Sequence, residues 1–321
     1  MMKIGQAKVI ADAAKLSEEE WQELRHKSIG SSDAAAVMSM GKYGSPYQVW
    51  EVKTGQRTIE QNFKMQLGHT MEPVILELAA QELGMDIAKP DLVLAHPDHP
   101  GLTCNLDGYA TNVYGETAIV EAKHAGNYLK GELRRWADSG KPDEDSATEG
   151  WWVQVQFQLM ICNMRQGYLA ALCDKEFFVI PVSYDVSFQD TMLDILPGWH
   201  KVHIENGIEP ALGGRDSDVV TRLFPKGHSD EVVDMDPVLD DVVMARDFKR
   251  QIKELKKELA EHDVRIKAHL GEGGVGMSDG EKIISSYTVE RKSVDYHKLF
   301  MEYPEVYKEV VSTSVSRMYR Y

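Results

Sequence analysis

The stretch Asn105–Lys123 reads NLDGYATNVYGETAIVEAK, and its pattern predicts two antiparallel strands joined by a turn near Gly115. Residues two apart on a strand share one face of the sheet, so Glu121 and Lys123 point the same way. Pairing of the two strands brings Asp107, in the first strand, beside Glu121 in the second. We therefore expect two carboxylates and one ammonium to converge at the end of a small sheet.

The residue types in this group suit the hydrolysis of a phosphodiester. Carboxylate oxygens are hard ligands, which suit Mg²⁺ better than Zn²⁺. An ammonium next to such an ion orients the attacking water or stabilises the charge that forms at phosphorus. An Asp followed later by Glu-x-Lys also occurs as ordinary charges on a half-exposed strand, so this pattern alone leaves both interpretations open.

The composition is that of a soluble protein with a sizeable core. Of the 321 residues, 43% are apolar and 27% are charged, which allows one large domain or two smaller ones. The chain shows no run of eighteen apolar residues and no apolar N-terminal signal, so we expect a cytoplasmic protein with no membrane partner. Three cysteines are too few for an all-cysteine iron–sulfur cluster, and we expect them to be reduced and buried. The net charge of −15 argues against electrostatic coating of nucleic acid but allows a local basic groove.

A candidate phosphate-binding site lies near the N-terminus. Ser17 and Glu20 form a capping box, which predicts a helix that carries Arg25 towards its end. The next residues, 28–38, read SIGSSDAAAVM and predict a second helix that begins at the two serines. Free amide donors at this helix start, together with the Ser32 hydroxyl, suit a phosphate, although plain capping by Ser32 is the alternative.

The middle of the chain alternates helical and strand patterns. We expect a polar loop over 56–66 and a helix over Gly68–Gly84, with Glu72 and Pro73 at the helix start. Strands are expected near Asp91–His96, Leu102–Val113, Gly167–Cys173 and Glu176–Tyr184, and helices over Ser146–Arg165 and Ser187–Asn206.

Two domains are expected, a core over residues 1–210 and a C-terminal extension over 211–321. The extension has a long helical pattern over Pro237–Leu270, in which apolar residues recur every seven positions, as in a short coiled coil or helical hairpin. Its last forty residues or so predict a small α+β tail with strand-like pieces near Ile284–Val294 and Ser312–Tyr321.

The motifs together resemble the lambda-exonuclease, or YqaJ-type viral recombinase, family of the PD-(D/E)xK nucleases over roughly residues 17–205. The order of several motifs is stronger evidence than any one of them. A proline usually precedes the first aspartate in this family, whereas this chain has Leu106 before Asp107. The matching segments are WQELRHKSIGSSD (21–33), LGHTMEP (67–73), NLDGY (105–109), IVEAK (119–123) and VQVQFQL (153–159).

The resemblance implies a fold and a role for each matching position. The expected fold is α/β, a restriction-endonuclease-like core with a mixed central sheet flanked by helices, followed by the helical extension. The family's basic residue shortly after the lysine has no clean match here, and Lys130, Arg134 or Arg135 are the candidates to replace it. The implied roles are metal binding by Asp107, Glu121 and the Ala122 carbonyl, water positioning by Lys123, support of the metal site by Glu72, a place in the cleft for Gln154, 5′-phosphate binding by Arg25 and Ser32, and a less certain phosphate contact by Asn105.

The activity that the resemblance implies is that of an alkaline-exonuclease-type deoxyribonuclease. It would use Mg²⁺, for which Mn²⁺ can substitute, and digest one strand of linear double-stranded DNA from its 5′ end. The 3′ overhang would serve a phage-type single-strand annealing protein, and the enzyme would form a homotrimeric ring encoded by a phage or prophage. Two alternatives stay open: an endonuclease on the same core, and a non-catalytic DNA-end-binding scaffold.

Overall fold

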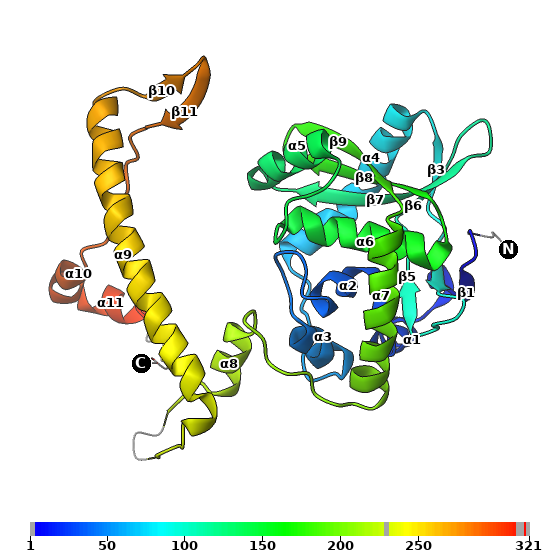
Figure 1. Ribbon diagram of the computed structural model, residues 1–321, viewed down its shortest axis with the longest axis horizontal. Helices are drawn as coiled ribbons and strands as arrows, with labels where there is room; N and C mark the ends of the chain where they lie inside the picture. The colour runs from blue at the N-terminus through cyan, green and yellow to red at the C-terminus, as the bar shows by residue number, and fades with distance from the viewer. Residues whose placement is uncertain (1–3, 228–230, 313–317, 319–321) are drawn as a thin grey trace. The chain divides into compact units, whose positions relative to one another are not determined.

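The computed structural model describes residues 4–227, 231–312 and 318 (Figure 1). The chain forms two compact units, Met1–Val219 and Val220–Tyr321, and the first contains all the candidate site residues. Residues 211–219 therefore pack with the first unit, beyond the boundary at 210 that the sequence suggests. Within the described ranges, no helix is both long enough and apolar enough to cross a bilayer.

The main sheet has five strands in the order β3-β6-β7-β8-β9. It is mixed, because β7 and β8 run parallel while the other neighbouring pairs run antiparallel. The long strand β7 lies at its centre, between β6 and β8. The strands are β3 (Asp86–Ala88), β6 (Gly108–Thr111), β7 (Thr117–Ala125), β8 (Gln166–Cys173) and β9 (Glu176–Ser183).

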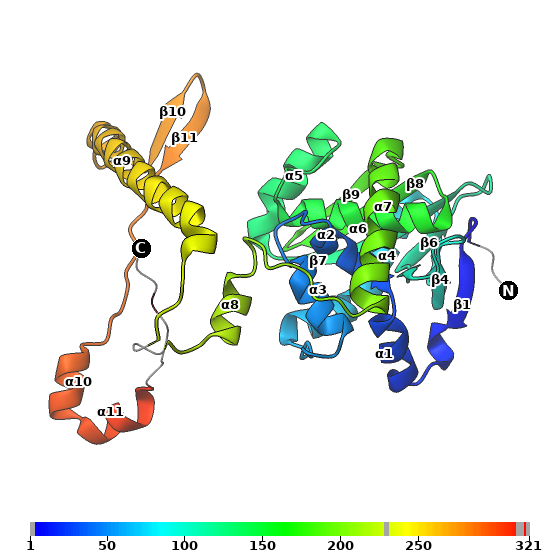
Figure 2. The same ribbon diagram turned by 60° about the horizontal axis from the view of Figure 1, so that its bottom comes forward.

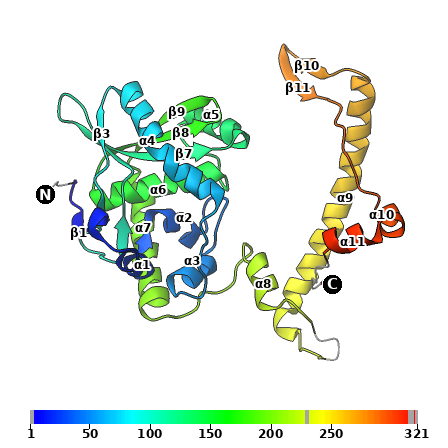
Figure 3. The same ribbon diagram turned by 180° about the vertical axis from the view of Figure 1, so that it is seen from behind.

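Helices α4 (Phe63–Leu83) and α6 (Ala147–Cys162) cover opposite faces of this sheet. Val120 of β7 packs in the cluster of α4, whereas its neighbour Ile119 packs in the cluster of α6. Figure 1 looks onto the α6 side and Figure 3 onto the α4 side. Glu121 and Lys123 have the parity of Ile119, so they face α6.

Helix α6 packs against the sheet closely because the second residue of β8 is a glycine, Gly167. A Cβ on Gly167 would lie 2.8 Å from Val155 Cγ1, closer than packed carbon atoms approach. Thirteen of the sixteen residues of α6 are buried, including Gln156 and Gln158, so both glutamines require partners inside the protein.

A second sheet has four strands in the order β1-β4-β5-β2. Its strands are β1 (Lys8–Asp12), β4 (Leu92–Ala95), β5 (Leu102–Cys104) and β2 (Ile29–Gly30). The pair β2 and β5 runs parallel, with Gly30 opposite Thr103. Parallel strands end at the same sheet edge, so the segments that follow β2 and β5 start side by side.

The expected single strand over Leu102–Val113 is wrong, because the chain changes sheet in its middle. β5 belongs to the four-stranded sheet and β6 to the five-stranded sheet, and Asn105–Asp107 connects them. Asp107 therefore lies immediately before β6 rather than inside a strand. The crossing residues need not continue a ladder, which frees the Asp107 side chain to bond across to β7.

The N-terminal helices follow their capping signals. Helix α1 (Glu18–His26) has the predicted capping box of Ser17 and Glu20, and α2 (Ser31–Val37) starts at the predicted serines. Helix α3 (Pro46–Lys53) is capped by Ser45, whose hydroxyl also bonds to the buried Asp216. That bond helps to hold residues 211–219 against the first unit.

Helix α4 begins five residues before the predicted start, so the predicted loop over 56–66 is too long. Asn62 caps it by accepting from the Met65 amide, and Pro73 lies inside the helix. The sequence predicts Pro73 in a first helical turn, where proline is favoured, whereas α4 continues through Pro73 and loses one backbone hydrogen bond there. Glu72 is therefore a mid-helix residue.

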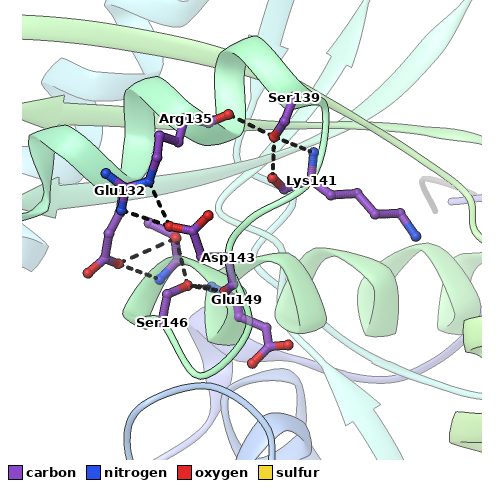
Figure 4. A network of polar contacts seen from close by, with 8 residues as sticks. Glu132, Arg135, Ser139, Lys141, Asp143, Ser146 and Glu149 are labelled. Carbon is purple, nitrogen blue, oxygen red and sulfur yellow. Dashed lines mark hydrogen bonds and ion pairs between the residues drawn. The ribbon is translucent and has the colours of Figure 1, made fainter.

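Helix α5 (Lys130–Ser139), which follows the 3₁₀ turn Asn127–Leu129, is joined to α6 by a polar loop (Figure 4). Arg135 pairs with Asp143 at 2.7 Å, and Ser146 caps α6 by accepting from the Glu149 amide at 3.0 Å. Glu149 in turn accepts from the Gly41 amide at 2.7 Å. These contacts fix the start of α6 and hence the positions of its glutamines.

Helix α7 (Val186–Trp199) lies beside α6 (Figure 2). The predicted helix over Ser187–Asn206 changes character within its length, because a π-helical segment (His200–Glu205) completes it. Helix α8 (Ser217–Leu223) follows. The three cysteines are buried free thiols, as expected.

The second unit is built on the long helix α9 (Leu239–Leu270), as the heptad pattern predicts. A hairpin of β10 (Val275–Ser278) and β11 (Glu281–Ser285) and the short helices α10 (Tyr296–Glu302) and α11 (Pro304–Val310) complete the described part. The strand expected near Ile284–Val294 ends at Ser285. The strand expected over Ser312–Tyr321 falls mostly outside the described residues.

Candidate active site

Glu121 is the most deeply buried charged group of the candidate site, with 1% of its surface exposed. Its carboxylate accepts three hydrogen bonds at 2.6 Å, from Lys123 Nζ and Gln154 Nε2 at one oxygen and from Gln158 Nε2 at the other. Burial of a carboxylate is costly unless donors compensate for the lost water. Helix α6 therefore supplies two of the three donors that keep this carboxylate inside the fold, and β7 supplies the third.

Lys123 completes the group on the same face of β7. Its ammonium lies 2.6 Å from Glu121 Oε1 and 3.0 Å from Gln154 Oε1. Burial favours the neutral amine, but the charges of Glu121 and Asp107 outweigh burial and raise the pKa of Lys123 above its ordinary value. Lys123 therefore carries a full positive charge at neutral and moderately alkaline pH.

Asp107 lies beside this group, as the strand pairing predicts. Gly108 is paired with Val120, and Asp107 Oδ2 accepts from the Ala122 amide at 2.9 Å. Burial, followed by the negative charge of Glu121, raises the pKa of Asp107 from 3.8 to about 8. Two neighbouring carboxylates of which one resists ionisation are a pair that a bound cation would stabilise.

The residues present fit a Mg²⁺ ion. Asp107, Glu121 and the backbone carbonyl of Ala122 offer oxygen ligands only, which is the donor set that Mg²⁺ prefers. Gln158 Oε1 is a buried acceptor without a hydrogen-bond partner in the described structure, so the local excess is of acceptors and not of donors. No group of three His, Cys, Asp or Glu side chains within the described residues could hold a metal on its own, which leaves backbone and water to complete the shell.

Glu72 approaches the site from α4 but is bound to another partner. Its Oε1 lies 2.6 Å from Lys89 Nζ, and the same bond raises the pKa of Lys89. The negative charge of Glu72 still acts on Asp107 and Lys123, raising the pKa of both. Glu72 is thus close enough to influence the carboxylate pair electrostatically, and Lys89 is a neighbour that the motif analysis missed.

Gln158 is the contact that sequence reasoning missed at the centre of the site. Gln154 and Gln158 lie four residues apart, so both project from the same face of α6 towards Glu121. Gln156, between them, points elsewhere and bonds to the Ser183 carbonyl at 2.8 Å. The signal was present as the spacing of glutamines in VQVQFQL, since a polar pair at i and i+4 on an otherwise apolar helix requires a polar partner.

The candidate end-binding residues lie on either side of the β2 strand. Arg25 is exposed in the last turn of α1 and has no side-chain partner among the described residues, and Ser32 is exposed in the first turn of α2. Because β2 runs parallel to β5, Ser32 follows the same sheet edge as Asn105. The Asn105 amide is already used, since Nδ2 donates to the Leu92 carbonyl at 3.0 Å.

The three basic candidates on α5 are all paired with carboxylates. Lys130 and Arg134 share Glu176, with Arg134 Nη2 at 2.9 Å, and Arg135 pairs with Asp143. The side chains of Arg134 and Arg135 are 58% and 59% exposed. Solvent therefore screens both ion pairs, and a phosphate can compete for either arginine.

Asp107, Glu121 and Lys123 thus meet beside one pair of strands in a mixed sheet. Residues 20–165 match the family model described as the YqaJ-like viral recombinase domain. This match confirms the resemblance that the order of the motifs indicates. The uncharacterized protein YqaJ of Bacillus subtilis (strain 168) is 25% identical over 318 residues, which cover 95% of this chain and 94% of that protein.

Solved structures of exonucleases are also similar to this chain. The alkaline exonuclease LHK-Exo of Laribacter hongkongensis, solved in complex with dAMP, is 20% identical, with a TM-score of 0.47 over 59% of this chain and 95% of that one. A phage-related exonuclease of Haemophilus somnus 129PT is 12% identical, with a TM-score of 0.41 over 59% of this chain and 100% of that one.

The raised pKa of Asp107 predicts how stability changes with pH. In chelator, Asp107→Asn should be more stable than the wild type at pH 8, and its advantage should shrink towards pH 5. The folded pKa, about 8, lies above the ordinary 3.8, so the folded chain binds more protons and loses stability as the pH rises between these values. Thermal melts at several pH values measure this difference, with Asp138→Asn, an exposed carboxylate, as the control. Identical pH dependence in Asp107→Asn and wild type would contradict it.

The two neighbouring glutamines of α6 provide a matched pair of variants. Gln156→Leu and Gln158→Leu each remove one buried amide, so both should lower the melting temperature. Only Gln158→Leu removes a donor from Glu121, so it alone should weaken Mg²⁺-induced stabilisation and slow catalysis, by roughly ten- to a hundredfold for a bond of about 1.5–3 kcal/mol to a charged group. Equal effects of the two variants on the Mg²⁺ response would exclude a site role for Gln158.

Proposed function

We propose that this chain is a Mg²⁺-dependent deoxyribonuclease that digests one strand of linear double-stranded DNA from its 5′ end. The observation that carries the proposal is the convergence of Asp107, Glu121 and Lys123, with Gln154 bonded to the last two. A protein that only binds DNA ends gains nothing from a buried carboxylate saturated with donors, because its charge contributes no affinity for phosphate.

The described side chains divide the chemistry between them. A divalent ion held by Asp107, Glu121 and the Ala122 carbonyl would polarise the phosphorus centre and neutralise the developing charge. Lys123 keeps its proton and donates it in a hydrogen bond to the attacking water or to a phosphate oxygen. Gln154 holds the Lys123 ammonium through its Oε1, at 3.0 Å, so the donor does not have to be ordered during the reaction.

The preference for an end is proposed from Arg25 and Ser32. A guanidinium binds a phosphate through two parallel hydrogen bonds and stays charged at every relevant pH. A terminal phosphate carries more negative charge than an internal one, so it gains more from such a contact. Because β2 and β5 run parallel, the segment with Ser32 starts beside the segment that leads to Asp107.

The products and partners follow from the same proposal. Removal of the 5′ strand leaves a 3′ overhang, which is the substrate of a single-strand annealing protein. A homotrimeric ring around the duplex would keep the enzyme on long DNA. Light scattering of the purified protein and the length dependence of digestion are the measurements that address assembly.

The first test of this function is digestion of linear duplex labelled at either end. With Mg²⁺ or Mn²⁺ we expect nucleotide release from the 5′ label first, no activity in excess EDTA, and no cleavage of a covalently closed circle. Asp107→Ala, Glu121→Ala and Lys123→Ala should each abolish release while the proteins stay folded. Nicking of the closed circle would instead indicate an endonuclease, and activity in chelator would overturn the metal dependence.

The second test concerns the 5′-phosphate. The wild type should digest 5′-phosphorylated duplex faster than 5′-hydroxyl duplex, and Arg25→Ala should lose most of this preference. A charge-assisted contact of about 1.5–3 kcal/mol corresponds to a preference of roughly ten- to a hundredfold. Arg25→Lys should restore only part of it, because lysine lacks the planar fork.

Arg134→Ala is the matched control for this test. Arg134 is an exposed arginine on α5, so its loss should slow both substrates equally. The alternative role for Arg25, an ion pair with Glu18 that supports α1, is disfavoured because the Arg25 guanidinium pairs with no carboxylate in the described part of the chain. An unchanged phosphate preference in Arg25→Ala would exclude the proposed contact.

A further inference from the structure

Lys53, the last residue of α3, is a buried lysine that the proposed chemistry does not use. Its side chain is 4% exposed. Its ammonium lies 2.6 Å from Asp33 Oδ2 and donates to the Arg25 carbonyl at 2.8 Å. One ammonium therefore bridges the last turn of α1 to the first turn of α2.

Stability alone is a poor reason to bury this pair. Removing a lysine and an aspartate from water is costly, and apolar residues of similar volume often serve the fold as well. The chain forms a comparable pair at the surface, where Lys15, 79% exposed, bonds to Asp12. The burial of the Lys53–Asp33 pair therefore calls for a local reason. The pair contacts the helix turns that carry Arg25 and Ser32, the two residues proposed to hold the terminal phosphate.

The backbone of Arg25 belongs to a helix end that several elements hold. The carbonyls of a last helical turn have no partner within the helix. Here Lys53 from α3 donates to the Arg25 carbonyl, and His200 Nε2 lies 2.8 Å from the Lys27 carbonyl. The exposed guanidinium of Arg25 therefore extends from a fixed backbone.

Asp33 lies next to Ser32 and would by itself oppose a phosphate. Its Oδ2 accepts from the Gly30 amide at 2.8 Å as well as from Lys53, which closes the turn between β2 and α2. A carboxylate only 19% exposed is weakly screened, so its charge would repel a phosphate bound at Ser32. The Lys53 ammonium cancels that charge.

We propose that Lys53 is a positioning residue for the terminal-phosphate contact, fixing the Arg25 backbone and neutralising Asp33 beside Ser32. The inference rests on the proposed function of Arg25 and Ser32. The inference adds Lys53 and Asp33, which do not contact the substrate but determine whether the pocket around Arg25 and Ser32 has a net positive charge. A substitution of Lys53 should therefore change the preference for 5′-phosphorylated over 5′-hydroxyl ends and should leave the catalytic step itself unchanged.

The test measures the ratio of digestion rates on 5′-phosphorylated and 5′-hydroxyl duplex. This ratio is independent of the folded fraction, because the same molecules digest both substrates. Lys53→Met should lower the ratio about tenfold, since it leaves the Asp33 charge unbalanced. The double variant Lys53→Met with Asp33→Asn should recover several-fold of the ratio, although it has fewer polar contacts than either single variant.

The controls separate this inference from the proposed function. Lys15→Met, which removes the exposed pair, should keep the wild-type ratio. A wild type without phosphate preference would overturn the pocket and the inference together. A wild type with the preference but a Lys53→Met variant that keeps it, or a double variant no better than Lys53→Met, would overturn the inference alone. If Lys53→Met does not fold, the double variant compared with Asp33→Asn decides: their ratios should agree within a few-fold, and a far lower ratio in the double variant would contradict neutralisation.

Discussion

The burial of the Glu121 carboxylate is the constraint on which the rest of the site depends. A charge with 1% exposure needs donors from the protein, and it receives them from Lys123 on its own strand and from two glutamines of α6. The helix must therefore be rotated so that Gln154 and Gln158 face β7. The polar loop between α5 and α6 fixes that rotation, and the apolar remainder of α6 fills the core around it.

The two sheets bring distant parts of the chain together. The crossing at Asn105–Asp107 passes from the strand next to β2 to the strand next to β7. A single short connection thus links the region of Arg25 and Ser32 to the carboxylate pair. The arrangement brings residues about ninety positions apart in the sequence into one region of the first unit.

Local rules predicted much of this from the sequence. Strand parity placed Glu121 and Lys123 on one face and Asp107 opposite them, and the capping box fixed the start of α1. The tertiary arrangement of these segments could not be predicted from local patterns. Nothing local shows that the stretch around Leu106 changes sheet, and a proline after Glu72 looks like a helix start although α4 continues through it.

The missed residues have the same explanation. Gln158, Lys53 and Lys89 owe their importance to partners 37, 20 and 17 positions away, namely Glu121, Asp33 and Glu72. For Lys53 and Lys89 no pattern over neighbouring residues indicates the partner, whereas the spacing of Gln154 and Gln158 on an apolar helix indicates only that some polar partner is needed. Their burial or their partner becomes apparent only when the helices are packed.

Gly167 is a position at which the packing of α6 against the sheet leaves no room for a side chain. Its missing side chain lets Val155 approach β8, and Val155 lies on α6 between the two glutamines that bond to Glu121. Even an alanine there would act as a spacer between helix and sheet and would lengthen both glutamine bonds at once, without touching the site. Substitutions at Gly167 would therefore impair the function of residues that Gly167 does not contact. A search for active-site residues by proximity alone would not identify this position.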